Sequence, residues 1–144
     1  MSTGQQRSLR VFVVDGSGDG GDSGQDWTEL TAGGAPAVRF SAPDLQHAQR
    51  TRRQLAGAAV LDVTVVVDDD FRSARRRWAE LDADGGQTVA YAGTLDGLAG
   101  LIADIFVAGV ADGVTLIPAA AQDDVRGLAE AALERAAARL QTAA

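Results

Sequence analysis

Short apolar segments alternate with amphipathic ones along almost the whole chain, and this alternation limits the fold more than any other feature. The apolar segments are rich in β-branched residues, which favours buried strands. They cover residues 9–14, 60–67, 88–92 and 114–117, with a shorter candidate at 37–40. The segments between them have apolar residues at helical spacing, which predicts helices at about 41–55, 71–84, 95–108 and 123–141. Ser41 and Thr94 are the expected N-caps of the first and third of these helices, and Gly109 is the expected C-cap of the third.

Strands that alternate with helices across short connections predict right-handed β-α-β units and a parallel sheet. The fold class is therefore α/β. Four or five strands fit either an open doubly wound sheet or half of a closed (β/α)8 barrel. A complete barrel needs roughly 250 residues, and this chain has 144. We expect a single domain over 1–144, with a polar tail at 1–8 and a flexible Gly/Asp loop at 15–26.

The composition removes several kinds of chemistry. The chain has no cysteine, no lysine and a single histidine, His47, so thiolate metal sites, thiol catalysis and Schiff-base chemistry are excluded. The net charge of −7 argues against a nucleic-acid partner. No apolar segment approaches the roughly 18 residues that span a bilayer. We expect a cytoplasmic protein that does not bind membranes.

The Gly/Asp loop matches two binding patterns. Gly16, Gly18 and Gly21 satisfy G-x-G-x-x-G directly after a strand, although Asp19 and Asp22 would repel a pyrophosphate. The segment also follows much of the calcium-binding EF-hand pattern, with Asp15, Ser17, Asp19, Gly20 and Asp26 in order. A solvated loop without a ligand is the third interpretation, and the sequence leaves all three open.

Asp68, Asp69 and Asp70 follow the strongest predicted strand. Three carboxylates could attract Mg²⁺ or Ca²⁺, but such a group more often caps a helix and favours the positive end of its dipole. We therefore predict a cap, followed by a helix that buries one apolar face. That face would hold Phe71, Ala74, Trp78 and Leu81, while Arg72, Arg75, Arg76 and Arg77 would face the solvent.

The second half of the chain resembles a known family. Segment 91–99 (YAGTLDGLA) precedes segment 105–118 (IFVAGVADGVTLIP), and the glycines, Thr94, Asp112 and Pro118 occur in the order found near the end of luciferase-like flavin-dependent monooxygenases. The nitrilotriacetate and long-chain alkane monooxygenase branch is the most similar. Segment 60–78 resembles the strand and arginine-rich helix that precede this motif, and segment 9–40 is a weaker match to an earlier strand and loop.

This resemblance implies the C-terminal half of a (β/α)8 barrel that uses FMN, or the deazaflavin F420 in relatives. Gly16, Ser17 and Gly18 would then lie at the flavin phosphate, and Gly93 and Thr94 at the mouth of the seventh strand. No residue is implied to be catalytic. Half a barrel would leave open strand edges, so we expect a homodimer or a complementary barrel subunit. The chain is then a truncated flavin-dependent oxidoreductase or a non-catalytic accessory module that acts through dimerisation.

Overall fold

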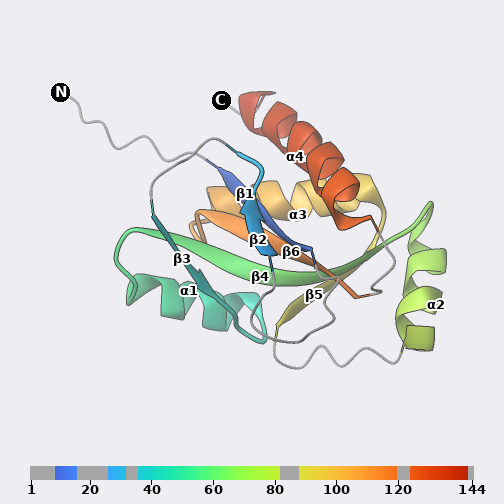
Figure 1. Ribbon diagram of the computed structural model, residues 1–144, viewed down its shortest axis with the longest axis horizontal. Coiled ribbons are helices and arrows are strands. Elements are labelled where there is room, and N and C mark those ends of the chain that lie inside the picture. Colours follow the sequence, from blue (N-terminus) through green and yellow to red (C-terminus); the bar gives the residue numbers. More distant parts are fainter. Residues whose placement is uncertain (1–8, 16–25, 32–35, 82–87, 120–123, 143–144) are drawn as a thin grey trace.

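The computed structural model describes residues 9–15, 26–31, 36–81, 88–119 and 124–142. They form an α/β fold in which strands and helices alternate from β3 onward (Figure 1). The strands are β1 (Arg10–Asp15), β2 (Asp26–Glu29), β3 (Ala37–Phe40), β4 (Ala58–Val67), β5 (Val89–Gly93) and β6 (Gly113–Pro118). The helices are α1 (Leu45–Arg53), α2 (Phe71–Leu81), α3 (Leu95–Val107) and α4 (Val125–Thr142).

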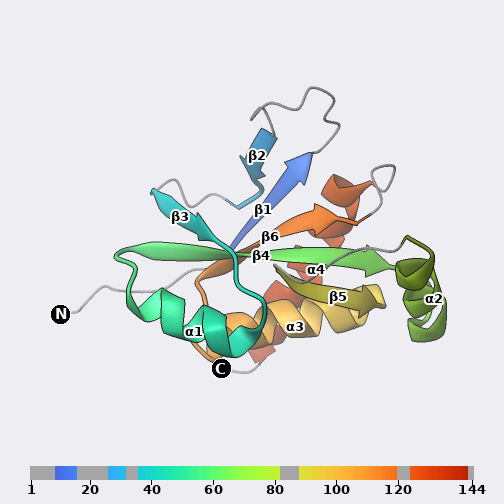
Figure 2. The same cartoon turned by 90° about the horizontal axis from the view of Figure 1, so that it is seen from below.

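The strands form one curled, mostly parallel sheet in the order β2-β1-β6-β4-β3. β2 is antiparallel to β1, and the other pairs are parallel. β4 is long enough to hold two neighbours along the same side, because β3 pairs with residues 58–61 and β5 with residues 63–67. β1 and β2 rise steeply away from β4, which gives the sheet its curl (Figure 2).

The predicted α/β class and the mostly parallel sheet are confirmed, whereas half of a (β/α)8 barrel is not. Consecutive strands are neighbours in such a barrel, but here the last strand, β6, lies between β1 and β4. β1 thereby covers an edge of β6 that half a barrel would leave open, and β2 covers the outer edge of β1. This arrangement satisfies backbone hydrogen bonds that an exposed edge would leave unpaired.

The main core lies between one face of the sheet and the helices α1, α3 and α4. Strand residues point alternately to the two faces, and every second residue of β1, β4 and β6 enters this core. Its buried members include Val11, Val13, Leu61, Val63, Leu116, Ala48, Leu98, Ile102, Ala132 and Ala136. α3 packs along α4, whereas α2 packs on β5 and β4. No helix within the described residues is long and apolar enough to cross a membrane.

The helix ends show which local sequence signals were enough to predict a helix boundary. Thr94 caps α3 as predicted, with its hydroxyl accepting the Gly97 N–H, and Gly109 follows the end of α3 with a φ of +76°. The expected cap at Ser41 is wrong. Asp44 caps α1 instead, because its carboxylate accepts the His47 N–H at 2.8 Å. His47 lies exposed on that helix.

The short strand β2 was not predicted, because three of its four residues, Asp26–Glu29, are polar. Contacts with β1 hold it in place. The ring of Trp27 stacks on Phe12 with 4.4 Å between the ring centroids, and Glu29 accepts two hydrogen bonds from Arg10. The loop expected at 15–26 therefore begins and ends inside paired strands.

Candidate functional site

The residues expected to hold a flavin are only partly within the structure. Gly16, Ser17 and Gly18 lie outside the described residues, and so does most of segment 15–26, on which the cation-binding interpretation rests. Gly93 and Thr94 are described, and they lie at the carboxyl end of β5 and the start of α3. They therefore lie at the carboxyl edge of the sheet, where parallel sheets bind ligands, and their contact with a flavin stays a prediction.

Tyr91 occupies the space beside that turn. Its hydroxyl donates a hydrogen bond to the Thr94 carbonyl at 2.9 Å, and that hydroxyl lies so close that a Cβ on Gly93 or Gly97 would overlap it. Burial raises the pKa of the Tyr91 phenol, so it remains a donor. The small size of Gly93 thus has a packing reason, and Thr94 serves as a helix cap.

The three aspartates after β4 also support the fold. The Asp70 carboxylate accepts the Ser73 N–H at 2.7 Å, which lowers the pKa of Asp70 and confirms the predicted helix cap. Asp68 accepts the Asp69 N–H and lies 3.7 Å from Arg77. In the part of the chain that the structure describes, no three His, Cys, Asp or Glu side chains are grouped to hold a metal ion.

The prediction for α2 needs correction. Ala74 is buried and Trp78 is partly buried, but Phe71 is 57% exposed and Leu81 38% exposed. Among the described elements, α2 packs mainly on β5 and β4, and Ala74 is its one buried residue. Arg77 is half-buried rather than solvated, because it donates a hydrogen bond to the Val67 carbonyl at 3.2 Å.

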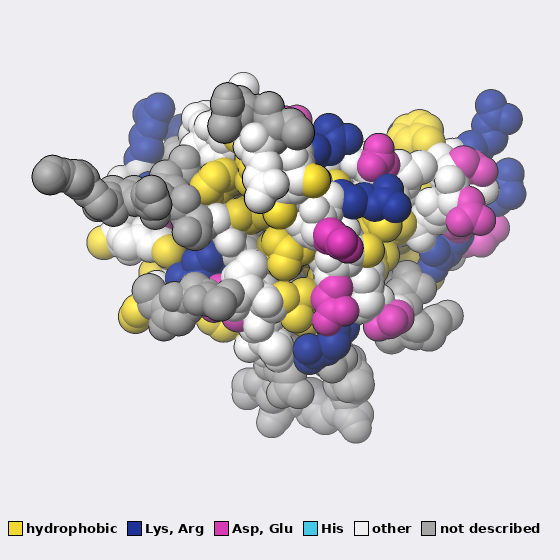
Figure 3. Space-filling model, turned by 90° about the horizontal axis from the view of Figure 1, so that it is seen from above, with side chains coloured by type: hydrophobic (Ala, Val, Ile, Leu, Met, Phe, Trp, Pro, Cys, Tyr) yellow, Lys and Arg dark blue, Asp and Glu magenta, His cyan; other side chains and the backbone are white. Residues whose placement is uncertain are grey.

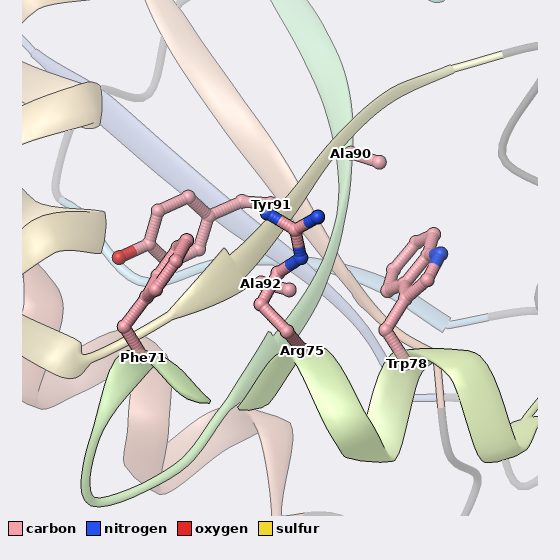
Figure 4. A pocket seen from close by; sticks show the side chains of 6 residues that line it. All are labelled: Phe71, Arg75, Trp78, Ala90, Tyr91 and Ala92. Carbon is pink, nitrogen blue, oxygen red and sulfur yellow. The ribbon is translucent and has the colours of Figure 1, made fainter. Parts of the chain in front are cut away.

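A groove runs between α2 and β5 (Figure 4). Phe71, Arg75 and Trp78 project from one side of α2 toward the strand, as expected for positions three and four residues apart. The lining is completed by Ala90, Tyr91 and Ala92, and the volume is about 410 Å³. The Arg75 guanidinium lies 5.3 Å from the centre of the Phe71 ring, which is within the range of a cation–π contact.

The outer edge of β5 borders this groove. Among the described strands, β5 pairs only with β4. The Gly93 carbonyl accepts the Asp68 N–H at 3.0 Å, and in a parallel pair successive residues bond to opposite sides. The backbone groups of Tyr91 and Gly93 therefore point to β4. Those of Ala90 and Ala92 point outward, where they offer two donors and two acceptors.

The face of the sheet away from the main core carries two partly buried polar pairs. Arg39 donates to Asp62 at 2.8 Å, and the Trp27 indole N–H donates to the Thr115 hydroxyl at 2.9 Å. Burial raises the pKa of Asp62, while Arg39 opposes that change. Asp62 could therefore hold a proton more readily than a surface carboxyl. It lies mid-strand, however, and its carboxylate is already held by Arg39 of the neighbouring strand.

Asp112, part of the family-like motif, lies at the opposite, amino-terminal edge of the sheet. Its carboxylate accepts the Ala59 N–H at 2.8 Å and lies 3.0 Å from the Arg52 guanidinium. Its backbone also pairs with Ala59 and with Arg10. Asp112 is 6% exposed, and it joins α1, β1 and β4 at one point. Ligands of parallel sheets bind at the carboxyl edge, so the place of Asp112 indicates a structural role.

The surface seen from above combines apolar and charged groups (Figure 3). Hydrophobic side chains gather in the middle of this face, with acidic and arginine side chains among them. Further charged side chains lie at the end where Figure 1 places α2.

No protein-family model matches the chain, and no curated protein matches it.

Neither the groove nor the outer edge of β5 was predicted from the sequence. The aromatic and arginine positions of α2 were visible in the sequence, but their spacing predicts a buried face as readily as an exposed one. The signal that could have found the site is the run of small residues Ala90, Ala92 and Gly93 beside a bulky Tyr91. Small side chains on a strand allow another chain to approach closely.

Proposed function

We propose that this chain is a non-catalytic accessory module that acts by strand pairing with another chain along β5. The observation that carries the proposal is the outward-facing backbone of Ala90 and Ala92 next to an exposed aromatic groove. An unpaired strand edge is a template for a further strand. The sequence suggests two kinds of partner, a second copy and a complementary subunit, and the edge of β5 could pair with a strand of either.

The described side chains at the carboxyl edge favour this proposal over catalysis. Asp70 and Thr94 cap helices, Asp68 pairs with Arg77, and Tyr91 fills the turn after β5. Each of these groups is already engaged in holding the fold. A catalytic site needs groups that are free to contact a substrate.

A truncated luciferase-like oxidoreductase that uses FMN or F420 is the second candidate. It is supported by the resemblance of segments 91–99 and 105–118. Gly16, Ser17, Gly18, Gly93 and Thr94 would hold the cofactor in an assembled dimer. The cofactor would supply the redox chemistry, and the protein would bind and orient it.

Flavin titration separates the two candidates. The purified chain is titrated with FMN and with F420 while cofactor fluorescence is followed, and sedimentation velocity gives its mass at each protein concentration. We expect no saturable change in fluorescence. Saturable quenching that is lost when Ser17 and Gly18 are replaced by tryptophan would support the oxidoreductase and contradict the accessory module.

A further inference from the structure

We infer that the segment which pairs with β5 is an extended acidic peptide of a different protein, with apolar residues between its carboxylates. This inference rests on the proposed function and specifies the chemistry of the partner. β5 supplies the backbone hydrogen bonds, which fix a strand but carry little sequence preference. The side chains of the α2–β5 groove decide which strand is accepted.

The charge of α2 points to an acidic partner. The helix carries four arginines and one glutamate in a chain whose net charge is −7. Within the described part of the chain, no carboxylate forms an ion pair with Arg72 or Arg75, and both are exposed. The contact with Phe71 holds the Arg75 guanidinium beside the groove. Arginine in such a place binds carboxylates well, because its planar fork can donate two hydrogen bonds.

The shape of the groove points to a strand with alternating side chains. Ala90 and Ala92 occupy little space, so the backbone of a partner can lie close to β5. Every second side chain of an added strand would point toward α2. A carboxylate there reaches Arg75, and an apolar side chain two residues along the peptide, which points the same way, covers Phe71 or Trp78, the first of which is 57% exposed. Covering such aromatic surface is favourable.

A second copy of this chain fits the same edge poorly. β5 has the sequence VAYAG and contributes no carboxylate. Two copies paired along β5 about a two-fold axis would bring their α2 helices together on one side of the sheet. Arg72 and Arg75 of each copy would then approach the same residues of the other, and like charges repel. A separate acidic chain avoids this repulsion.

The test uses a short fluorescein-labelled peptide in which glutamate and valine or phenylalanine take turns at every second position, with threonine between them, so that both kinds of side chain point the same way. Its affinity for the full chain is measured by fluorescence anisotropy, alongside peptides with glutamine or lysine in place of glutamate. The variants are Arg75→Glu, Trp78→Ala and Ala92→Pro, the last of which removes an outward N–H without touching the bonds to β4. Arg126→Glu on the exposed surface of α4 is the matched charge control. Circular dichroism checks that each variant is folded.

We expect saturable binding of the glutamate peptide that weakens as salt is added. Glutamine in the peptide, Arg75→Glu or Ala92→Pro should each weaken binding about tenfold or more, and Arg126→Glu by less than about twofold. Equal affinity for the glutamate and glutamine peptides, or no binding up to about 1 mM, would overturn the inference. If the peptide fails while the chain forms a dimer that Ala92→Pro dissociates, only this inference fails and the proposed function stands.

Discussion

Replacing Asp112 should destabilise the protein more than replacing any exposed acidic residue. Its carboxylate accepts the Ala59 N–H at 2.8 Å and two contacts from the Arg52 guanidinium at 3.0 and 3.1 Å. Asp112→Ala removes all of these acceptors at a position that is 6% exposed. The buried Ala59 N–H then has no partner, and the partly buried Arg52 loses its counter-charge.

The size of the effect follows from these contacts. An unpaired buried donor costs about 1–3 kcal/mol. Breaking a fully buried ion pair costs about 3–5 kcal/mol, but the Arg52 side chain is 29% exposed, so water recovers part of that loss. We expect Asp112→Ala to lower the free energy of unfolding by roughly 2–4 kcal/mol. Asp112→Asn keeps an acceptor for Ala59, and its cost should be about 1–2 kcal/mol.

Urea unfolding followed by far-ultraviolet circular dichroism measures both variants against the natural chain, provided that the transition is two-state. Asp104→Ala, on the exposed side of α3, is the control and should change stability by less than about 0.5 kcal/mol. If Asp112→Ala is no more destabilising than this control, Asp112 does not join α1, β1 and β4 as described.

Three further perturbations test other parts of the structure. Burial raises the pKa of Asp62 above its ordinary value of 3.8, so the folded state binds this proton more tightly than the unfolded chain. Protonated Asp62 therefore stabilises the fold at low pH, and this stabilisation is lost as the pH rises through the folded-state pKa. In Asp62→Asn the urea midpoint should fall less with rising pH across the acidic range than it does in the natural chain. Gly93→Ala should lower the free energy of unfolding by about 1–3 kcal/mol, because the added methyl group would overlap the Tyr91 hydroxyl. Replacing Tyr91 by leucine in the same chain removes that hydroxyl and should recover most of the lost stability. Trp27→Phe keeps the aromatic ring but leaves the fully buried Thr115 hydroxyl without its indole donor, which should lower the urea midpoint by the equivalent of about 1–2 kcal/mol; an unchanged midpoint would argue against that hydrogen bond.

The sequence predicted what local interactions decide. β-branched runs identified β4 and β6, and Thr94 and Gly109 marked both ends of α3. These features depend on residues within a few positions of one another, which a sequence shows directly. The α/β class followed from their alternation.

Features that depend on distant residues were not predicted. The sheet order depends on whether β1 pairs with β3 or with β6. The strand segments are apolar whichever pairing forms, so their hydrophobicity does not decide between the two orders. β2 exists only because Trp27 and Glu29 find partners on β1. The same limit applies to the groove, because the exposure of Phe71 depends on how much of α2 the sheet covers.

Amide hydrogen exchange along β5 tests the central claim most directly. The rates at Ala90, Tyr91 and Ala92 are measured by nuclear magnetic resonance in the free chain and with the glutamate peptide at saturation. Tyr91, whose N–H faces β4, should exchange slowly in both states. Ala90 and Ala92 should exchange fast in the free chain and slowly in the complex. Slow exchange at Ala90 and Ala92 in the free monomer, or fast exchange that the bound peptide leaves unchanged, would contradict strand pairing along β5.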